Sequence, residues 1–415
     1  MMLQMQKRQK FNLSLLSKLI LSKSLVAIMA TGLFAVNDKG KYFSKENHKS
    51  LLEKPRKGLS NEQYDQFILG RSFFTIPWVE APSATTARDG LGPLFNANTC
   101  KSCHPGNGRG ELYTSSGTVS RSLVVRVSIP NDGSKKHETL ASKMGFVPHE
   151  VYGNQISING VHGVPFEARV KIDFEKIEVN FPDGEKDIIL KPKYELVDKN
   201  YGDLDGAILS YRMAQTMHGL GMIEKISDKS ILANEDIDDS NGDGISGKAN
   251  RVYSPLTKQE AIGRYTWKAS APSILEQVAG AANNDMSITT SLHINDNCTS
   301  SQKKCNEAPK PRHKEDLPDL RLGAIDFYIR NLRAYEPIKD EKFKEGLEVF
   351  KALDCAKCHT TSFTTVDGFE VSPYSDFLLH DMGEGLADGR VEFDATASEF
   401  RTAPLWGLSL HKKIN

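Results

Sequence analysis

One short motif occurs twice in the chain and constrains its structure more than any other feature: Cys100-Lys-Ser-Cys103-His104 and Cys355-Ala-Lys-Cys358-His359. Both copies read C-x-x-C-H, the attachment motif for haem c. Two cysteines three positions apart lie on one face of a helical turn, so both thiols can form thioethers with one haem. The histidine that follows then supplies the proximal nitrogen to iron. The sequence therefore predicts two covalent haems, with His104 and His359 as iron ligands.

A zinc site is the alternative explanation of the cysteines. Two C-x-x-C knuckles can together form a four-cysteine zinc site. Zinc does not require a histidine directly after both knuckles, however, and the two motifs lie far apart in the sequence. Haem attachment is therefore the better interpretation.

The first residues resemble an export signal. Lys7, Arg8, Lys10 and Lys18 precede an apolar run at residues 24–36, so residues 1–36 are predicted to be a signal peptide. An uncleaved N-terminal anchor is the alternative, and only then would the protein contact a membrane. Because haem c is attached outside the cytoplasm, both interpretations predict a periplasmic protein. The 53 basic and 53 acidic residues balance, so no nucleic-acid partner is expected.

The whole chain of 415 residues is long enough for two or three domains. Residues 37–60 are polar and lysine-rich and are predicted to be a linker. A helix is expected from residue 61, strands alternate over about 119–200, and a helical pattern resumes over 204–226. We therefore expect a mainly α fold with two cytochrome-c-like domains. The first, at 61–335, would carry a β-rich insertion, and the second would occupy 336–415.

Two further features have a structural and a functional interpretation each. Asp239, Asn241, Asp243 and Ile245 match the opening of a calcium loop, but Asn250 stands where a bidentate glutamate is usual. A turn rich in Asx and glycine explains the same residues, and the pattern leaves both open. Cys298 and Cys305 are predicted to form a local disulfide in an oxidising compartment, with a redox-active pair as the alternative.

Over residues 60–415 the chain resembles the di-haem oxidoreductases of the bacterial cytochrome c peroxidase superfamily. It is most similar to the large-insert branch called "thiol oxidoreductase". The segments that carry the resemblance, besides the haem motifs, are GPLFNA (92–97), DGISG (243–247), LLHDMG (378–383), LADG (386–389) and FRTAPLWG (400–407).

The resemblance implies a role for three more residues. Trp267 matches the family tryptophan that carries electrons from the C-terminal to the N-terminal haem. Gln277 and Asp285 match a glutamine and an acidic residue that assist peroxide cleavage at the N-terminal haem. The family acid is usually glutamate, and aspartate is one methylene shorter. Without the resemblance, Trp267 would be interpreted as a buried anchor, and Gln277 and Asp285 as an exposed helix face.

The distal haem ligands are less well defined. The family continues beyond FRTAPLWG with a helix that carries the sixth ligand of the C-terminal haem, whereas this chain ends at Asn415. The resemblance therefore implies a C-terminally truncated member, with His380 and Met382 as the nearest substitutes. For the first haem, the candidates in sequence range are His137, His149, His162 and His218, of which His218 is preferred.

Together these observations predict a periplasmic di-haem c-type oxidoreductase with peroxidase-type activity. The resemblance implies hydrogen peroxide as substrate and a small cytochrome c or cupredoxin as electron donor. A non-catalytic electron-transfer cytochrome is the first alternative, and a haem-based modifier of another molecule is the second. A literal thiol oxidoreductase is disfavoured because the haem motifs occupy four of the six cysteines.

Overall fold

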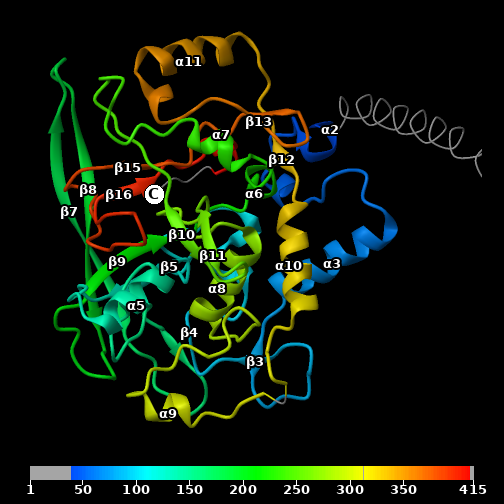
Figure 1. Ribbon diagram of the computed structural model, residues 1–415, viewed down its shortest axis with the longest axis vertical. Coiled ribbons are helices and arrows are strands. Elements are labelled where there is room, and N and C mark those ends of the chain that lie inside the picture. The colour runs from blue at the N-terminus through cyan, green and yellow to red at the C-terminus, as the bar shows by residue number, and fades with distance from the viewer. Residues whose placement is uncertain (1–38, 312, 412–415) are drawn as a thin grey trace, which may run out of the picture.

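A computed structural model describes residues 39–311 and 313–411 (Figure 1). The predicted signal peptide or anchor at 1–36 lies outside these residues. Within the described part, no helix is both long enough and apolar enough to cross a membrane.

The helices are short and separated by many loops. The α-helices are α2 (Lys39–Tyr42), α3 (Asn61–Thr75), α4 (Cys100–Cys103), α5 (Lys135–Met144), α6 (Leu220–Ile223), α7 (Asp228–Leu232), α8 (Ile274–Met286), α9 (Lys303–Asn306), α10 (Asp319–Arg330) and α11 (Glu341–Ala352). Single 3-10 turns are η2 (Lys49–Glu53), η3 (Pro105–Asn107), η4 (Cys355–Lys357) and η5 (Leu408–Leu410).

The strands of the described part form two-stranded sheets. They are β1 (Phe43–Ser44), β2 (Val79–Glu80), β3 (Asp89–Leu91), β4 (Leu94–Phe95), β5 (Leu123–Ser128), β6 (Asn159–Gly160), β7 (Arg169–Asn180), β8 (Lys186–Val197), β9 (Ile208–Met213), β10 (Arg251–Ser254), β11 (Gln259–Ile262), β12 (Ala334–Tyr335), β13 (Phe363–Thr364), β14 (Glu370–Val371), β15 (Leu379–Asp381) and β16 (Glu399–Arg401). Helix makes up 26% and strand 23% of the structure, so the fold is mixed and not mainly α as the sequence predicted. Many of these strands have only two to four residues, too few for a periodic pattern to reveal them.

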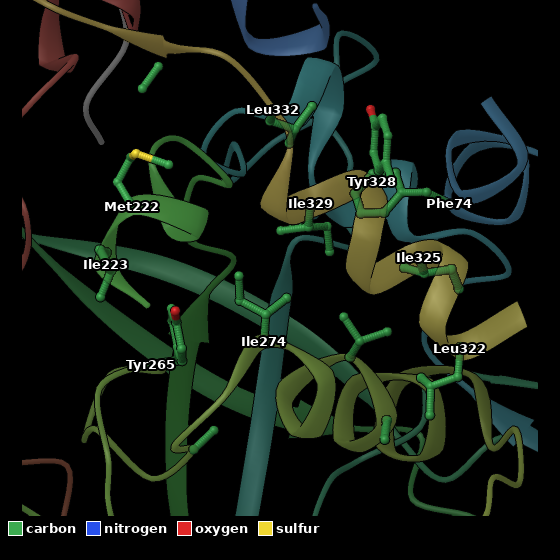
Figure 2. Packing of buried hydrophobic residues seen from close by; sticks show 14 of the residues in the cluster. Phe74, Met222, Ile223, Tyr265, Ile274, Leu322, Ile325, Tyr328, Ile329 and Leu332 are labelled. Carbon is green, nitrogen blue, oxygen red and sulfur yellow. The ribbon is translucent and has the colours of Figure 1, made fainter. Parts of the chain in front are cut away.

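A helical core surrounds the first haem motif. Ser60 caps the N-terminus of helix α3: its side chain accepts from the Gln63 amide, while the Gln63 side chain accepts from the Ser60 amide. Helix α10 packs against α3 so closely that a Cβ at Gly70 would overlap the Ala324 carbonyl. Figure 2 shows apolar side chains of α10, such as Ile325 and Ile329, facing those of α6 and α8.

The β-rich insertion extends further along the chain than predicted. The β7–β8 hairpin pairs Ile177 with Ile189 and forms one side of the molecule (Figure 1). Strand β5 pairs in antiparallel fashion with β9, with Val125 opposite Tyr211. The prediction of a helix over 204–226 is therefore wrong for 208–213. Because the partner of β9 lies far earlier in the sequence, the local pattern alone did not identify the pairing.

Two other sequence predictions have clear outcomes. The described part of the predicted linker is folded: η2 buries Leu51 and Leu52, and β1 pairs with β12. The prediction of the Cys298–Cys305 disulfide is confirmed. Cys305 is buried in an apolar cluster with Leu94, which indicates a structural disulfide.

Candidate haem and peroxide site

The first haem motif lies on the one-turn helix α4 and the residue after it. Thr99 caps the N-terminus of this helix, and its side chain accepts from the Ser102 amide. Cys103 is buried, Cys100 is half-buried, and both are free thiols. Burial, reinforced by the nearby Asp285 carboxylate, raises the pKa of Cys100 to about 12. Because Cys100 and Cys103 lie three positions apart on this single turn, both side chains project from one face of it, as thioether formation to a single haem requires.

The ring of His104 is oriented by a backbone carbonyl. Its Nδ1 lies 2.7 Å from the Gln215 carbonyl oxygen, to which it donates. Burial lowers the pKa of His104, so the ring is neutral near pH 7. A neutral ring with Nδ1–H bound to a carbonyl presents the Nε2 lone pair, the arrangement that orients histidine ligands in metalloproteins.

Two cavities adjoin this motif and share several lining residues. The larger, of about 170 Å³, is lined by Cys103, His104 and the β5–β9 sheet. The smaller, of about 80 Å³, is mainly apolar and is lined by Cys100 and by Ile274 and Ile325 of the core in Figure 2. An apolar space beside a few polar groups, next to two thiols and a histidine, fits a covalently attached haem.

The three residues implied by the resemblance all reach this site. Gln277 and Asp285, both on α8, line both cavities, and Trp267 lines the larger one. They are half-buried and face the haem motif, so the interpretation of Gln277 and Asp285 as a solvent-exposed helix face is wrong. The structure therefore brings Trp267 and helix α8 next to the first haem motif, which lies more than 150 positions earlier in the sequence. Local sequence patterns could not predict this proximity.

Gln155 is a member of the site that sequence reasoning missed. This buried amide donates to Asp285 Oδ1 at 2.8 Å and to Asn96 Oδ1 at 2.7 Å. It therefore fixes the orientation of the Asp285 carboxylate and leaves Oδ2 for other partners. Gln155 lies between short segments of the insertion, and no motif distinguishes it in the sequence.

The second haem motif follows helix α11 and lies at η4. His359 Nδ1 lies 2.7 Å from the Tyr374 carbonyl oxygen, the same arrangement as in His104. Phe350 of α11 packs at right angles to the Tyr374 ring and edge-on to His359. Both cysteines are free and half-buried. Thus each predicted proximal histidine has its orientation fixed by a backbone carbonyl.

Trp267 is hydrogen-bonded to two strands, one near each motif. Its indole N–H donates to the Met213 carbonyl at 2.9 Å, beside the first motif. Its own carbonyl accepts from the Arg401 amide at 2.9 Å, in strand β16. The partner strand β15 carries His380, whose Nδ1 lies 3.7 Å from Cys358 Sγ. Hydrogen bonds and strand pairing therefore run from Met213 through Trp267 to the strand pair that lies against Cys358.

The two substitute ligands predicted for the second haem differ in their surroundings. His380 is buried, and its nitrogens contact Asp376 Oδ2 and the Ser246 carbonyl, both at 2.8 Å. Burial lowers its pKa, but hydrogen bonds to Asp376 and Cys358 outweigh this effect and raise the pKa to about 10. Both nitrogens thus act as donors here and offer no lone pair to iron. Met382 is 49% exposed, and its role stays a prediction.

Of the four histidines considered for the distal side of the first haem, only His218 lines the cavity within the described part. Its Nε2 accepts from the Tyr335 amide at 2.7 Å, so the neutral ring carries its proton on Nδ1. That Nδ1 is buried and has no hydrogen-bond partner among the described residues. In this conformation His218 presents a donor, not a ligand lone pair, and its ligand role stays a prediction.

The other three histidines make contacts elsewhere. The His137 side chain contacts Asp132, and the His149 side chain accepts from the Val151 amide. The backbone amide of His162 donates to Glu80.

The candidate calcium loop directs its oxygens to its own backbone. Asp239 Oδ1 accepts from the Asp243 amide at 3.0 Å, and Asn241 Oδ1 accepts from the same amide at 2.8 Å. Asp243 Oδ1 accepts from Ile245, and its Oδ2 lies 3.8 Å from Lys357 Nζ of the second haem motif. No group of three or more His, Cys, Asp and Glu side chains in the described part could hold a metal ion. These contacts favour the Asx turn over the calcium loop.

This arrangement gives a simple expectation for calcium. We expect Ca²⁺ at about 5 mM, above the dissociation constants of about 10⁻⁴–10⁻³ M of weak extracellular sites, to leave the melting temperature unchanged. Differential scanning calorimetry with and without EGTA measures this. A rise in melting temperature that EGTA reverses and that Asp239→Asn abolishes would establish the calcium loop instead.

A buried network of charges joins the insertion to the C-terminal segment. Arg212 of β9 lies 2.9 Å from Asp388 and 2.7 Å from Glu392. Lys268 and Arg390 contact the same two carboxylates, at 3.2 Å and 2.9 Å. Burial raises the pKa of Glu392, but the surrounding guanidinium groups outweigh it and hold that pKa well below its ordinary value. The network therefore stays charged at neutral pH and fixes the cavity wall that carries Arg212.

Comparison with known proteins places this geometry in context. A family model described as "Di-haem oxidoreductase, putative peroxidase" matches residues 35–415. This range includes both haem motifs and the cavity residues Trp267, Gln277 and Asp285. Comparisons with curated proteins and with solved structures give no match.

Proposed function

The chain belongs to the di-haem oxidoreductase family, and from this membership we propose that it is a periplasmic c-type cytochrome that reduces hydrogen peroxide. The observation that carries the proposal is the convergence of Trp267, Gln277 and Asp285 on the cavity beside Cys103 and His104. A cavity that holds a positioned carboxylate and an amide next to an iron ligand suits proton-coupled cleavage of a small oxidant.

The two motifs would hold the haems as thioethers, with His104 and His359 as proximal ligands. When bound, the haems would supply the iron and the electrons for the redox chemistry. The protein contributes the orientation of the two histidines, through Gln215 and Tyr374, and access to the first cavity.

Asp285 is the proposed proton carrier at this site. Because Gln155 occupies Oδ1, the oxygen available to accept a proton from peroxide and return it to the departing oxygen is Oδ2. Gln277, which lines the same cavity, would donate its amide hydrogen to peroxide and orient it. Trp267 would conduct electrons between the two haem sites, because it contacts the first through Met213 and the strand pair of the second through Arg401.

Replacing Trp267 with phenylalanine tests this proposal. We expect peroxide reduction by the di-haem protein to slow about tenfold or more, equivalent to about 1.4 kcal/mol in the barrier. Steady-state turnover with a small reduced cytochrome or cupredoxin as donor is the measurement. Trp78→Phe is the matched control, because Trp78 is buried in the core beside Phe73 and does not line the larger cavity.

An electron-transfer cytochrome without catalysis is the second candidate. The presence of His218 in the cavity wall favours it, because a ring that exchanged its Tyr335 bond for iron would close the site to peroxide. A carrier of this kind would exchange electrons at the same rate in the Trp267→Phe variant and would show no peroxide turnover in either form.

A further inference from the structure

The larger cavity is lined by many more cations than anions. Five arginines line it, whereas Asp285 is its one lining carboxylate among the described residues. The arginines are Arg109, Arg126, Arg212, Arg264 and Arg401. A buried charge without a partner is costly, so the partner of each of these groups needs to be identified.

Most of these arginines have their partners within the protein. Arg212 pairs with Asp388 and Glu392. Arg264 pairs with Asp228 and donates to the Ile226 carbonyl. The guanidinium of Arg401 donates to the Thr266 and Thr402 carbonyls. The charges of these three side chains therefore have partners without any ligand, although Arg264 Nε is buried without a hydrogen bond among the described residues.

Arg109 and Arg126 differ from these three, because no hydrogen bond or ion pair joins either guanidinium to a described residue, and Arg126 is the one whose backbone lies beside the Asp285 site. It is half-buried on β5, and neither a hydrogen bond nor an ion pair joins its guanidinium to a residue in the described ranges. The carboxylates nearby are already engaged: Glu392 with Arg212 and Arg390, and Asp285 with Gln155. Arg126 also forms a β-bridge with Gln155, so its backbone is anchored beside the Asp285 site.

We propose that the Arg126 guanidinium binds a carboxylate inside the larger cavity and that this carboxylate belongs to the haem attached at Cys100 and Cys103. Haem carries two propionate side chains, and the planar fork of arginine matches a carboxylate with two parallel hydrogen bonds. The apolar smaller cavity would cover the porphyrin, while the cationic wall of the larger one would face its carboxylate edge. This inference rests on the proposed haem site but not on peroxidase activity.

The test is the midpoint potential of the first haem in the holoprotein, measured by spectroelectrochemical titration with and without acetate as a soluble carboxylate. Loss of a cation beside the haem favours the ferric form, so Arg126→Gln should lower the potential and Arg126→Lys should restore part of it. Arg121→Gln is the matched control, because Arg121 is exposed and adjoins the same motif without lining either cavity. Acetate should change neither the wild-type potential nor its spectrum.

Two results would overturn the proposal. One is a shift in Arg126→Gln no larger than that in Arg121→Gln. The other is a saturable effect of acetate on the wild type that disappears in Arg126→Gln, which would assign the site to an external carboxylate. If the glutamine variant fails to fold, Arg126→Lys is compared with Arg121→Lys by the same criterion. Haem content, measured as the pyridine adduct, separates these outcomes from failure of the haem proposal, which would leave the wild type with fewer than two haems.

Discussion

Replacing Asp285 with asparagine is expected to lower peroxide turnover about 10²–10⁴-fold, the usual contribution of a positioned general acid–base group. Asparagine keeps an oxygen to accept from Gln155, so the packing of the site should be preserved. It cannot carry a proton between the two peroxide oxygens, however. The measurement is steady-state turnover under saturating donor, together with haem content of each variant.

Asp285→Glu is the matched control for this experiment. The resemblance implies glutamate as the usual acid at this position, so the variant should retain turnover within about tenfold of the wild type. If Asp285→Asn turns over peroxide as fast as the wild type with both haems present, Asp285 has no role in proton transfer.

The largest effect on stability is expected from Arg212→Met. This change leaves Asp388 and Glu392 buried with fewer partners, and breaking a buried ion pair costs about 3–5 kcal/mol. Because Lys268 and Arg390 still contact the two carboxylates, the lower end of that range is expected. Urea unfolding monitored by circular dichroism measures the free energy of unfolding.

The exposed pair Lys136–Glu150 provides the control, since the side chain of Lys136 is 68% exposed. Lys136→Met should change the free energy of unfolding by less than about 1 kcal/mol. The pH dependence gives a second criterion. Because the folded-state pKa of Glu392 is lowered, its stabilisation is fully present above the unfolded-state pKa and is lost as pH falls through the folded-state pKa. The difference between wild type and Arg212→Met should therefore shrink in acid, and a difference independent of pH would contradict the account.

The sequence predicted those parts of the site that depend on short-range spacing. The C-x-x-C-H motifs predicted six haem-binding residues, and the two cysteines seven positions apart form the expected disulfide. Helices α3, α8 and α11 follow strong local signals: a capping box at Ser60, a serine cap at Ser273 and an aspartate cap at Asp340. The cavity residues Trp267, Gln277 and Asp285 were identified through the family resemblance, not through local pattern.

The remainder depends on contacts between distant segments. Gln155 acquires its role only because the insertion folds back onto α8, and Arg212 acquires its role only because β9 meets the C-terminal segment. The pairing of β5 with β9 also replaced a predicted helix by a strand. Such residues carry ordinary local signals, so only the three-dimensional arrangement reveals them.

The central claim is that the first haem site is open to peroxide and is supplied with electrons from the second. The most direct test mixes the partly reduced holoprotein with hydrogen peroxide and follows the haem absorption over milliseconds. We predict rapid oxidation of both haems that continues as turnover when a reduced donor is added and slows in Trp267→Phe. An unchanged or slowly bleaching spectrum in the wild type would contradict the claim and leave the electron-transfer cytochrome as the function.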